Sequence, residues 1–281
     1  MFMEFENVNY TYRGSRVPAL QNLTLRIPTG KRCALIGQNG CGKTTLFLLA
    51  NGLYQPQKGT IRWHDRPLRY DRSSLMQLRQ QVGLVFQDPE QQLVASTVEE
   101  DISYGLYNLG LPTHEVARRV QQALIEFKLT ELAGTPVHHL SLGQKKRVAI
   151  ADVMVLRPQL LLLDEPTAYL DPRQTRNLLK LLDDIQTTGT TVFIATHDLD
   201  FVYCWADWVM VMDQGQLVME GTPQSVFAQR QIMEDLELGI PTLLELLAKL
   251  SDPENDNYAY DQSAIGIEKL QRQILKSLKC L

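Results

Sequence analysis

The stretch LIGQNGCGKTTL occupies residues 35–46 and places a glycine-rich loop between two apolar segments. Its spacing matches G-x-x-x-x-G-K-[ST], the pattern of a phosphate-binding loop. Glycines let backbone N–H groups close around phosphate oxygens, the lysine reaches the outer phosphates, and the threonine hydroxyl can bind Mg²⁺. The residues expected to bind a nucleotide here are Gly37, Gln38, Asn39, Gly40, Cys41, Gly42, Lys43, Thr44 and Thr45.

The segments on either side of this loop support that interpretation. RCALIG, residues 32–37, predicts a buried strand, and TTLFLLANGL, residues 44–53, predicts a helix from about residue 43 to 51. The positive N-terminal end of such a helix points at the bound anion. An incidental lysine in a glycine-rich turn would not explain this strand–loop–helix order.

A second polar pair follows the apolar segment QLLLLDEP, residues 159–166. Four leucines in a row predict a strand buried on both faces, and parallel sheets bind ligands at the carboxyl ends of such strands. Asp164 is placed to hold Mg²⁺ through water, whereas Glu165 points elsewhere and is placed to polarise a water against a γ-phosphate. Alone, the two carboxylates would read as a solvated acidic pair, but the phosphate loop favours the catalytic interpretation.

Two more polar residues follow apolar runs. His197 comes at the end of the apolar part of TVFIATHDLD, residues 191–200, and Gln87 follows the run at residues 82–86. A lone histidine is more often structural, but beside the other sites it becomes a candidate for contact with the γ-phosphate. Gln87 can bind Mg²⁺ or water and can move when the γ-phosphate leaves.

The segment HHLSLGQKKRVAIADVMVLRPQLLLLDEPTAYLDP, residues 138–172, contains a further anion site. Ser141 predicts a helix N-cap, and Gly143 and Gln144 open the helix that follows. The phosphate loop already holds the nucleotide, so a second anion site on the same chain requires an explanation.

Here the chain resembles the ATP-binding subunits of ABC transporters. LSLGQ, residues 140–144, is similar to their signature motif L-S-G-G-Q. In that family two subunits meet head to tail, and the signature of one closes over the ATP held by the other. The resemblance therefore implies that Ser141, Gly143 and Gln144 complete the ATP site of a second ABC ATPase subunit, in a homodimer or a heterodimer.

The resemblance covers about residues 3–245, with six motifs in the family's order. It implies that Tyr12 stacks on adenine and that Gln87 is the Q-loop glutamine. It further implies that Asp164 and Glu165 are the Walker B pair, His197 the switch histidine and Asp171 the D-loop aspartate that contacts the partner. Two positions depart from the pattern: Leu142 replaces the first signature glycine, and Tyr169 stands where many members have a small residue.

The expected fold class is α/β, with a P-loop NTPase (RecA-like) core, an antiparallel β edge subdomain, a helical insert and a C-terminal helical extension. We expect the ATPase domain at residues 1–225, the insert at about 88–144 and the extension at 226–281. FENVNYTY, ALQNLTLRI and GTIRWHD predict the antiparallel strands, and the insert contains an amphipathic helix. Its apolar face consists of Val116, Val120, Leu124 and Phe127.

The extension contains the short amphipathic segment TLLELLAKL, residues 242–250, and a later apolar stripe. Two interpretations of the stripe are open, packing on the core and contact between two subunits. The stripe consists of Ile267, Leu270, Ile274, Leu278 and Leu281.

Composition excludes several classes of function. The 281 residues carry a net charge of −4, which does not indicate a nucleic-acid partner. No stretch approaches the roughly 18 apolar residues of a membrane span. Four scattered cysteines predict reduced thiols rather than disulfides or a zinc site. With the resemblance, this places the chain at the cytoplasmic face of the cell membrane, as a peripheral partner of integral membrane transporter subunits.

Two segments, at residues 86–111 and 140–151, are most similar to the energy-coupling factor (ECF) branch of this family, nearest to its cobalt and nickel importers. The resemblance implies an ATPase that uses ATP and Mg²⁺ to power uptake of a micronutrient, with cobalt or nickel ion favoured. Biotin or another vitamin is the alternative. A non-transport ABC ATPase is less favoured, because the chain lacks the long coiled-coil or zinc inserts usual in those proteins.

Two details of the insert lead to further expectations. Pro89, Gln91, Gln92 and Leu93 lie where the resemblance implies that a coupling helix of the membrane partner docks. His138 and His139 are adjacent, so their rings are expected to point apart, and no acidic or cysteine residue is near in sequence. We therefore expect no metal site at these two histidines.

Overall fold

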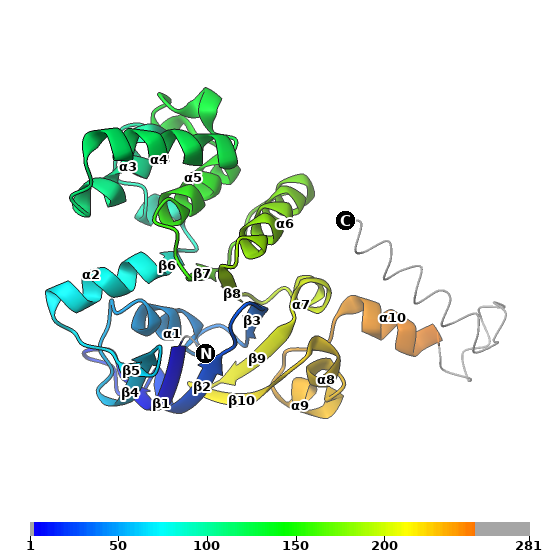
Figure 1. Ribbon diagram of the computed structural model, residues 1–281. Helices are drawn as coiled ribbons and strands as arrows, with labels where there is room; N and C mark the ends of the chain where they lie inside the picture. Colours follow the sequence, from blue (N-terminus) through cyan, green and yellow to red (C-terminus); the bar gives the residue numbers. More distant parts are fainter. Residues whose placement is uncertain (1–2, 251–281) are drawn as a thin grey trace.

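Two β-sheets form the base of the structure, and helices cover and extend them (Figure 1). The computed structural model describes residues 3–250. The strands are β1 Met3–Tyr10, β2 Leu20–Ile27, β3 Arg32–Ile36, β4 Lys58–Trp63, β5 Arg66–Pro67, β6 Val82–Val85, β7 Leu160–Asp164, β8 Thr191–Ala195, β9 Trp208–Asp213 and β10 Gln216–Gly221.

Helices occupy most of the remaining described residues. The α-helices are α1 Lys43–Ala50, α2 Arg72–Gln81, α3 Val98–Asn108, α4 Thr113–Glu126, α5 Leu142–Met154, α6 Pro172–Thr187, α7 Leu199–Trp205, α8 Pro223–Phe227, α9 Arg230–Asp235 and α10 Thr242–Leu250. Short 3-10 helices are η1 Pro89–Gln91, η2 Thr130–Leu132 and η3 Val137–His139.

The larger sheet has the order β10-β9-β3-β8-β7-β6, and all its pairings are parallel except that of β10 with β9. Its register places Leu35, Ala195 and Asp164 in one row across β3, β8 and β7. The chain segments that leave these three strands therefore start side by side at one edge of the sheet.

Both faces of this sheet are buried, because alternate residues of each strand point to opposite sides. In β8, Val192 and Ile194 pack into one apolar cluster with α5, α6 and α7. Phe193 and Ala195 pack into the other, with α1 and the smaller sheet. The ring of Phe193 contacts that of Phe47 in α1, with centroids 5.2 Å apart. This packing fixes α1 against the middle of the sheet.

The smaller sheet is antiparallel, with the order β2-β1-β4-β5. From Leu23 to Ile27, β2 alternates buried and exposed residues, as a strand with one covered face does. The expected antiparallel edge subdomain is confirmed, together with the P-loop core.

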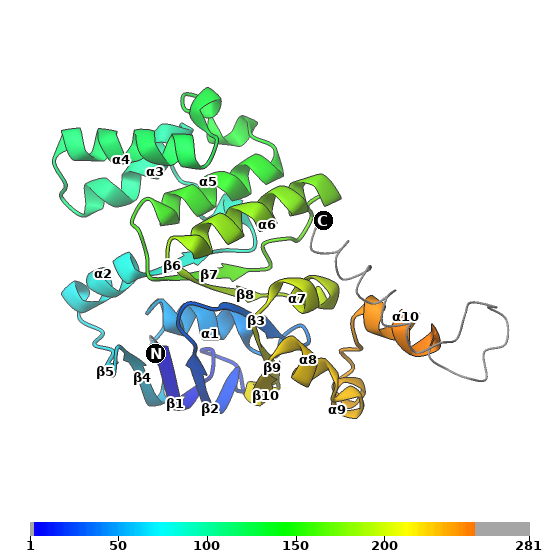
Figure 2. The ribbon, with the colours of Figure 1, turned by 45° about the vertical axis from the view of Figure 1, so that its right-hand side comes forward.

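The helices α3, α4 and α5 form a separate layer, which Figures 1 and 2 show standing away from the smaller sheet. A capping box between Thr97 and Glu100 starts α3. The amphipathic face predicted for the next helix is confirmed in α4, where Val116, Val120 and Leu124 are buried. Beyond the end of α4, Phe127 is buried in the same cluster.

The chain after β10 returns to the core through α8, α9 and α10. Thr242 starts α10, and its backbone N–H and hydroxyl donate to Asp200 in α7 at 2.7 and 2.8 Å. The predicted segment at residues 242–250 is helical, whereas the stripe at residues 267–281 lies outside the described residues. No helix between residues 3 and 250 is long and apolar enough to cross a membrane.

Candidate functional site

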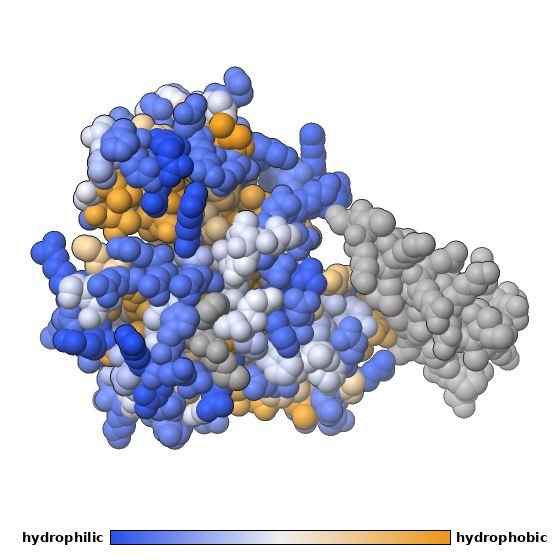
Figure 3. All heavy atoms as spheres, in the orientation of Figure 1, coloured by the Kyte–Doolittle hydropathy of each residue, from blue (hydrophilic) through white to orange (hydrophobic). Residues whose placement is uncertain are grey.

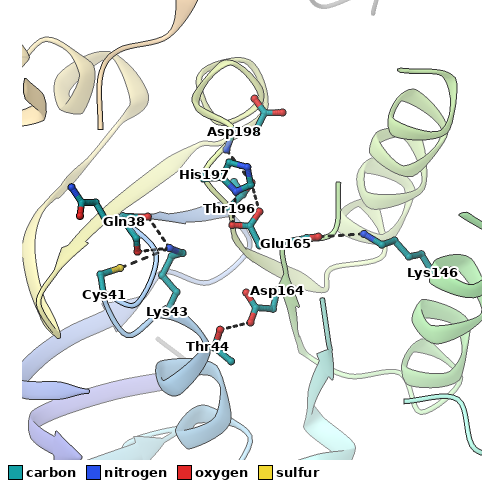
Figure 4. Close-up of polar contacts among 11 residues, drawn as sticks. Gln38, Cys41, Lys43, Thr44, Lys146, Asp164, Glu165, Thr196, His197 and Asp198 are labelled. Atoms are coloured by element: carbon teal, nitrogen blue, oxygen red, sulfur yellow. Dashed lines mark hydrogen bonds and ion pairs between the residues drawn. The ribbon is translucent and has the colours of Figure 1, made fainter. Parts of the chain in front are cut away.

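The glycine-rich loop connects β3 to α1, at the edge of the sheet where β7 and β8 also end. Lys43 turns back into this loop, and its ammonium donates to the carbonyl oxygens of Gly37 and Gln38 at 2.7 and 3.0 Å. Figure 4 shows the lysine enclosed by the loop. A buried cation inside a ring of backbone groups at a helix N-terminus can bind an anion such as a phosphate.

The backbone of the loop depends on glycine at its last position. Gly42 has φ +108°, a value that L side chains rarely adopt. A Cβ at Gly42 would lie 2.5 Å from the carbonyl oxygen of Ala19 and 2.8 Å from Leu20. The loop therefore packs directly on the smaller sheet, and a side chain has no room there.

The first turn of α1 is joined to the end of β7. The hydroxyl of Thr44 donates to Oδ2 of Asp164 at 2.6 Å. Asp164 is 6% exposed. Burial raises the pKa of Asp164 and nearby Glu165 adds to this, while the bond from Thr44 and the charge of Lys43 oppose it. The exposed hydroxyl of Thr44 and the buried carboxyl of Asp164, whose charged form a cation would stabilise, are oxygen ligands that fit Mg²⁺.

Glu165 points away from Asp164, toward the residues that follow β8. Its Oε2 accepts a hydrogen bond from Thr196 at 3.1 Å, and its Oε1 lies 2.9 Å from Nδ1 of His197. Figure 4 shows the carboxylate of Glu165 held between these two residues. Glu165 is 7% exposed, whereas the His197 side chain is 70% exposed. The carboxylate is thus held in place, and the imidazole can reach a ligand outside.

Of the other predicted residues, Tyr12 contacts the end of the phosphate loop, whereas Gln87 lies at a neighbouring strand end. The hydroxyl of Tyr12 shares a hydrogen bond of 3.0 Å with Thr45, and the Tyr12 ring lies edge-on to that of Tyr54. Gln87 follows β6 beside β7 and is exposed. Within residues 3–250 the Gln87 side chain makes no hydrogen bond, so it is free to turn toward a ligand.

The signature residues form a separate group. Ser141 caps α5 by accepting a bond from the backbone of Gln144, which confirms the predicted N-cap. In the described part of the chain no hydrogen bond links Ser141, Gly143 or Gln144 to the phosphate loop. Asp171 likewise caps α6 by accepting from the backbone of Gln174 at 2.7 Å.

Three features of the site were missed in the sequence. The first is Thr196, which donates a hydrogen bond to Glu165. The position of Thr196, between a buried strand and His197, could have indicated a role in the site. The second is a pair of hydrogen bonds from the Gln38 side chain, to the carbonyl of Leu236 and to the Glu237 carboxylate. These bonds join the phosphate loop to the segment after α9. Lys146 is buried and bonded beside Glu165, although a lysine in KKR predicts a solvated side chain.

The expectation that the rings of His138 and His139 point apart is wrong. Their centroids are 4.3 Å apart in an edge-on contact within η3, so the two rings turn toward each other. Among the residues that the structure describes, no group of three or more histidine, cysteine, aspartate or glutamate residues could hold a metal ion.

Comparison with known proteins identifies relatives over most of the chain. The family model for "ABC transporter" matches residues 20–168. A protein of Nostoc sp. with a provisional name as an ABC transporter ATP-binding protein is 66% identical over 87% of this chain and 89% of its own length. The energy-coupling factor transporter ATP-binding protein EcfA2 of Clostridium perfringens is 39% identical over 97% of this chain and 95% of its own length.

Solved structures show the same arrangement. CbiO1 of Clostridium perfringens, described as part of the ABC transporter complex cbiONQ, has a TM-score of 0.75 and 41% identity over 88% of this chain and 98% of its own. The ATP-binding cassette MJ0796, a dimer in a post-hydrolysis state with ADP and Pi, has a TM-score of 0.71 and 26% identity over 79% of this chain and 98% of its own.

The close approach of Gly42 to Ala19 predicts an unequal effect of two similar substitutions. Gly42→Ala should lower the free energy of unfolding by about 3 kcal/mol, because it combines a positive φ with a backbone clash. Gly14→Ala should cost only about 1 kcal/mol, because Gly14 also has positive φ but its Cβ would meet open space. Urea unfolding followed by circular dichroism measures both, and equal losses would contradict the packing described for the loop.

Proposed function

The chain belongs to the ABC transporter ATP-binding proteins, in their energy-coupling factor branch, and on that premise we propose how its residues share the work of ATP hydrolysis. Members of this family are ATPases that serve transport through separate membrane subunits. The observation that carries the proposal is the meeting of the phosphate loop, Asp164 and Glu165 at neighbouring strand ends.

The residues of the loop bind the substrate. Lys43 exchanges its carbonyl partners for phosphate oxygens, and the loop N–H groups and the start of α1 hold the remaining charge. Tyr12, fixed to Thr45, offers its ring to the adenine. Positioning and charge stabilisation supply most of the catalysis, as in other phosphoryl transfers.

Glu165 acts as the general base. Its carboxylate accepts a proton from the attacking water as the water oxygen bonds to the γ-phosphorus and the bond to the β-phosphate oxygen breaks. Thr196 keeps the carboxylate in place through its hydroxyl. We expect His197 to release Oε1 of Glu165 and to contact the γ-phosphate, since its ring is mostly exposed.

Three residues of this chain would hold Mg²⁺. Thr44 and Asp164 already face each other, and Gln87 lies on the neighbouring strand end with an unengaged amide. When bound, the ion neutralises charge that develops on the phosphates. A site with few protein ligands suits Mg²⁺, which usually keeps waters and substrate oxygens in its shell.

The signature residues serve a second subunit. Ser141, Gly143 and Gln144 lie at the N-terminus of α5, where backbone N–H groups can bind an anion. In the described residues, no hydrogen bond joins them to the phosphate loop of their own chain. We propose that they close over ATP bound by a partner cassette, and that Asp171 contacts this partner. The complete set of motifs permits two copies of this chain as well as a pair with a second type of ATPase subunit, and we propose the pair of copies for the test.

A membrane subunit would dock between the helical layer and α2. Figure 3 shows hydrophobic side chains gathered on the side of the helical layer above the hollow that faces α2. Exposed large hydrophobic residues include Met76 in α2, Val94 before α3, and Tyr104 and Tyr107 in α3. Of the four residues proposed after Gln87, Pro89 is buried, and Gln92 is bonded to Phe86 and Ala149. Gln91 is exposed and remains the best candidate for contact.

We propose that the complex imports a micronutrient, with the chain peripheral to the cytoplasmic face of the membrane. We take cobalt ion as the first cargo to test and nickel ion and vitamins as the alternatives, because residues 86–111 and 140–151 are most similar to the cobalt and nickel importers of the ECF branch. We also propose residues 1–225 as the ATPase unit, with the insert at about 88–144, and residues 226–281 as an extension.

Loss of the base should separate binding from hydrolysis. Glu165→Gln should lower kcat by about 10²- to 10⁴-fold, because the amide cannot accept the proton of water. ATP affinity, measured by titration calorimetry, should stay within about twofold, since Glu165 does not line the phosphate loop. Glu131→Gln, on an exposed residue of η2, serves as the control. Turnover near the wild-type level in Glu165→Gln would remove Glu165 from this role.

The cargo can be tested in cells of the organism that makes this protein. Replacing the gene by its Glu165→Gln form should stop uptake of radioactive cobalt ion, because the membrane subunits lose their source of energy. Uptake of labelled nickel ion and biotin, measured in the same cells, should be unchanged. Loss of biotin uptake with normal cobalt uptake would instead support the vitamin alternative.

A further inference from the structure

Lys146 is a buried cation that the mechanism above does not use. It is 4% exposed and lies in the second turn of α5, five residues after Ser141. Its ammonium donates to the backbone carbonyls of Glu165, Pro166 and Ala168 at 3.3, 2.8 and 2.7 Å. An ammonium has three N–H donors, and these three carbonyls accept all of them.

The turn that Lys146 holds is strained. Glu165 has φ +44° and Tyr169 has φ +63°, both in the left-handed region that non-glycine residues seldom occupy. Two backbone hydrogen bonds of 3.2 Å close the turn, from Ala168 N–H to the carbonyl of Glu165 and from Leu170 N–H to that of Thr167. Backbone strain of this kind persists only where the surroundings hold it. Lys146 is the side chain that binds the carbonyls on both sides of this turn.

Glu165 is therefore fixed from two directions. Figure 4 shows its carboxylate directed to Thr196 and His197, and its carbonyl directed to Lys146. Asp88, which follows Gln87, also acts electrostatically on Lys146. Burial lowers the pKa of Lys146 to about 8, and the charges of Glu165 and Asp88 oppose this decrease. The Lys146 ammonium thus interacts with the turn that begins at Glu165 and with Asp88 beside Gln87, while its own helix α5 begins at the signature.

We propose that Lys146 is a positioning residue, which holds the Glu165 turn in its catalytic conformation and links it mechanically to the signature helix. The proposal deepens the function proposed above and rests on it. The start of α5 also packs closely on α6, because a Cβ added at Gly143 would lie 2.9 Å from the side chain of Gln174. When α5 closes on the partner's ATP, its movement reaches this chain's own base through Lys146.

The test uses the purified full chain with MgATP and compares Lys146→Met with Lys145→Met. Met is unbranched like lysine and keeps its helix preference, but has no donors. Lys145 is the neighbouring lysine of α5, and its ammonium pairs with exposed Glu90 instead of the turn. We expect Lys146→Met to lose about 10- to 100-fold in kcat, as a displaced general base does. Its ATP affinity and the kcat of Lys145→Met should stay within about twofold of wild type.

Further variants separate positioning from stability. Lys146→Arg keeps a cation with several N–H donors and should retain most of the wild-type kcat. If Lys146→Met does not fold, Lys146→Gln replaces it with the same expectation, because its shorter amide cannot reach all three carbonyls. The kcat is expressed per folded molecule, so that a smaller folded fraction is not mistaken for slower catalysis.

Three results would overturn the proposal. Wild-type kcat in Lys146→Met would show that the turn does not need the lysine, although ATP hydrolysis by the wild type would leave the proposed function standing. Equal losses in Lys146→Met and Lys146→Arg would show that the donors are not what matters. A wild-type chain that does not hydrolyse ATP would overturn the proposed function and this inference together.

Discussion

The hydrogen bond between Thr44 and Asp164 joins the start of α1 to the end of β7 across 120 residues of sequence. It exists because the register of the parallel sheet brings Leu35, Ala195 and Asp164 into one row. The loop after β3, the carboxylates after β7 and the residues after β8 are thereby held at one edge. A change of register by one residue would turn the Asp164 side chain to the opposite face of the sheet, away from Thr44, and the site would be lost.

The site has two kinds of support. The sheet is buried on both faces and gives the strand ends a rigid base. The turn at residues 165–169 has no such base and contains two left-handed residues, so it relies on Thr196 and Lys146. We regard this division as the physical basis of the proposed link, in which the phosphate loop stays fixed while the Glu165 turn follows the signature helix α5 through Lys146.

Much of the fold could be predicted from the sequence, because apolar runs such as LLLL and TVFIA, each followed by a polar residue, are typical of parallel strands that end at a site. Asp164 and Glu165 were predicted for the same reason, the phosphate loop from its glycine and lysine spacing, and the cap at Ser141 from a serine that precedes a helical pattern. Lys146 could not be predicted, because its burial depends on where the Glu165 turn lies in space. The contact of Gln38 with Leu236 spans 198 residues and leaves no local pattern. The contact between the rings of His138 and His139 depends on how the two side chains are rotated, which their adjacency in the sequence does not reveal.

The central claim is that the chain carries two half-sites and that ATP joins the halves of two subunits. The direct measurement is the mass of the Glu165→Gln protein in solution, by light scattering after size-exclusion chromatography, with and without MgATP. We predict a mass of 32.0 kDa without nucleotide and twice that value with it. A mass that stays at 32.0 kDa while MgATP is bound, or one that is doubled without any nucleotide, would contradict ATP as the link between two copies of this chain.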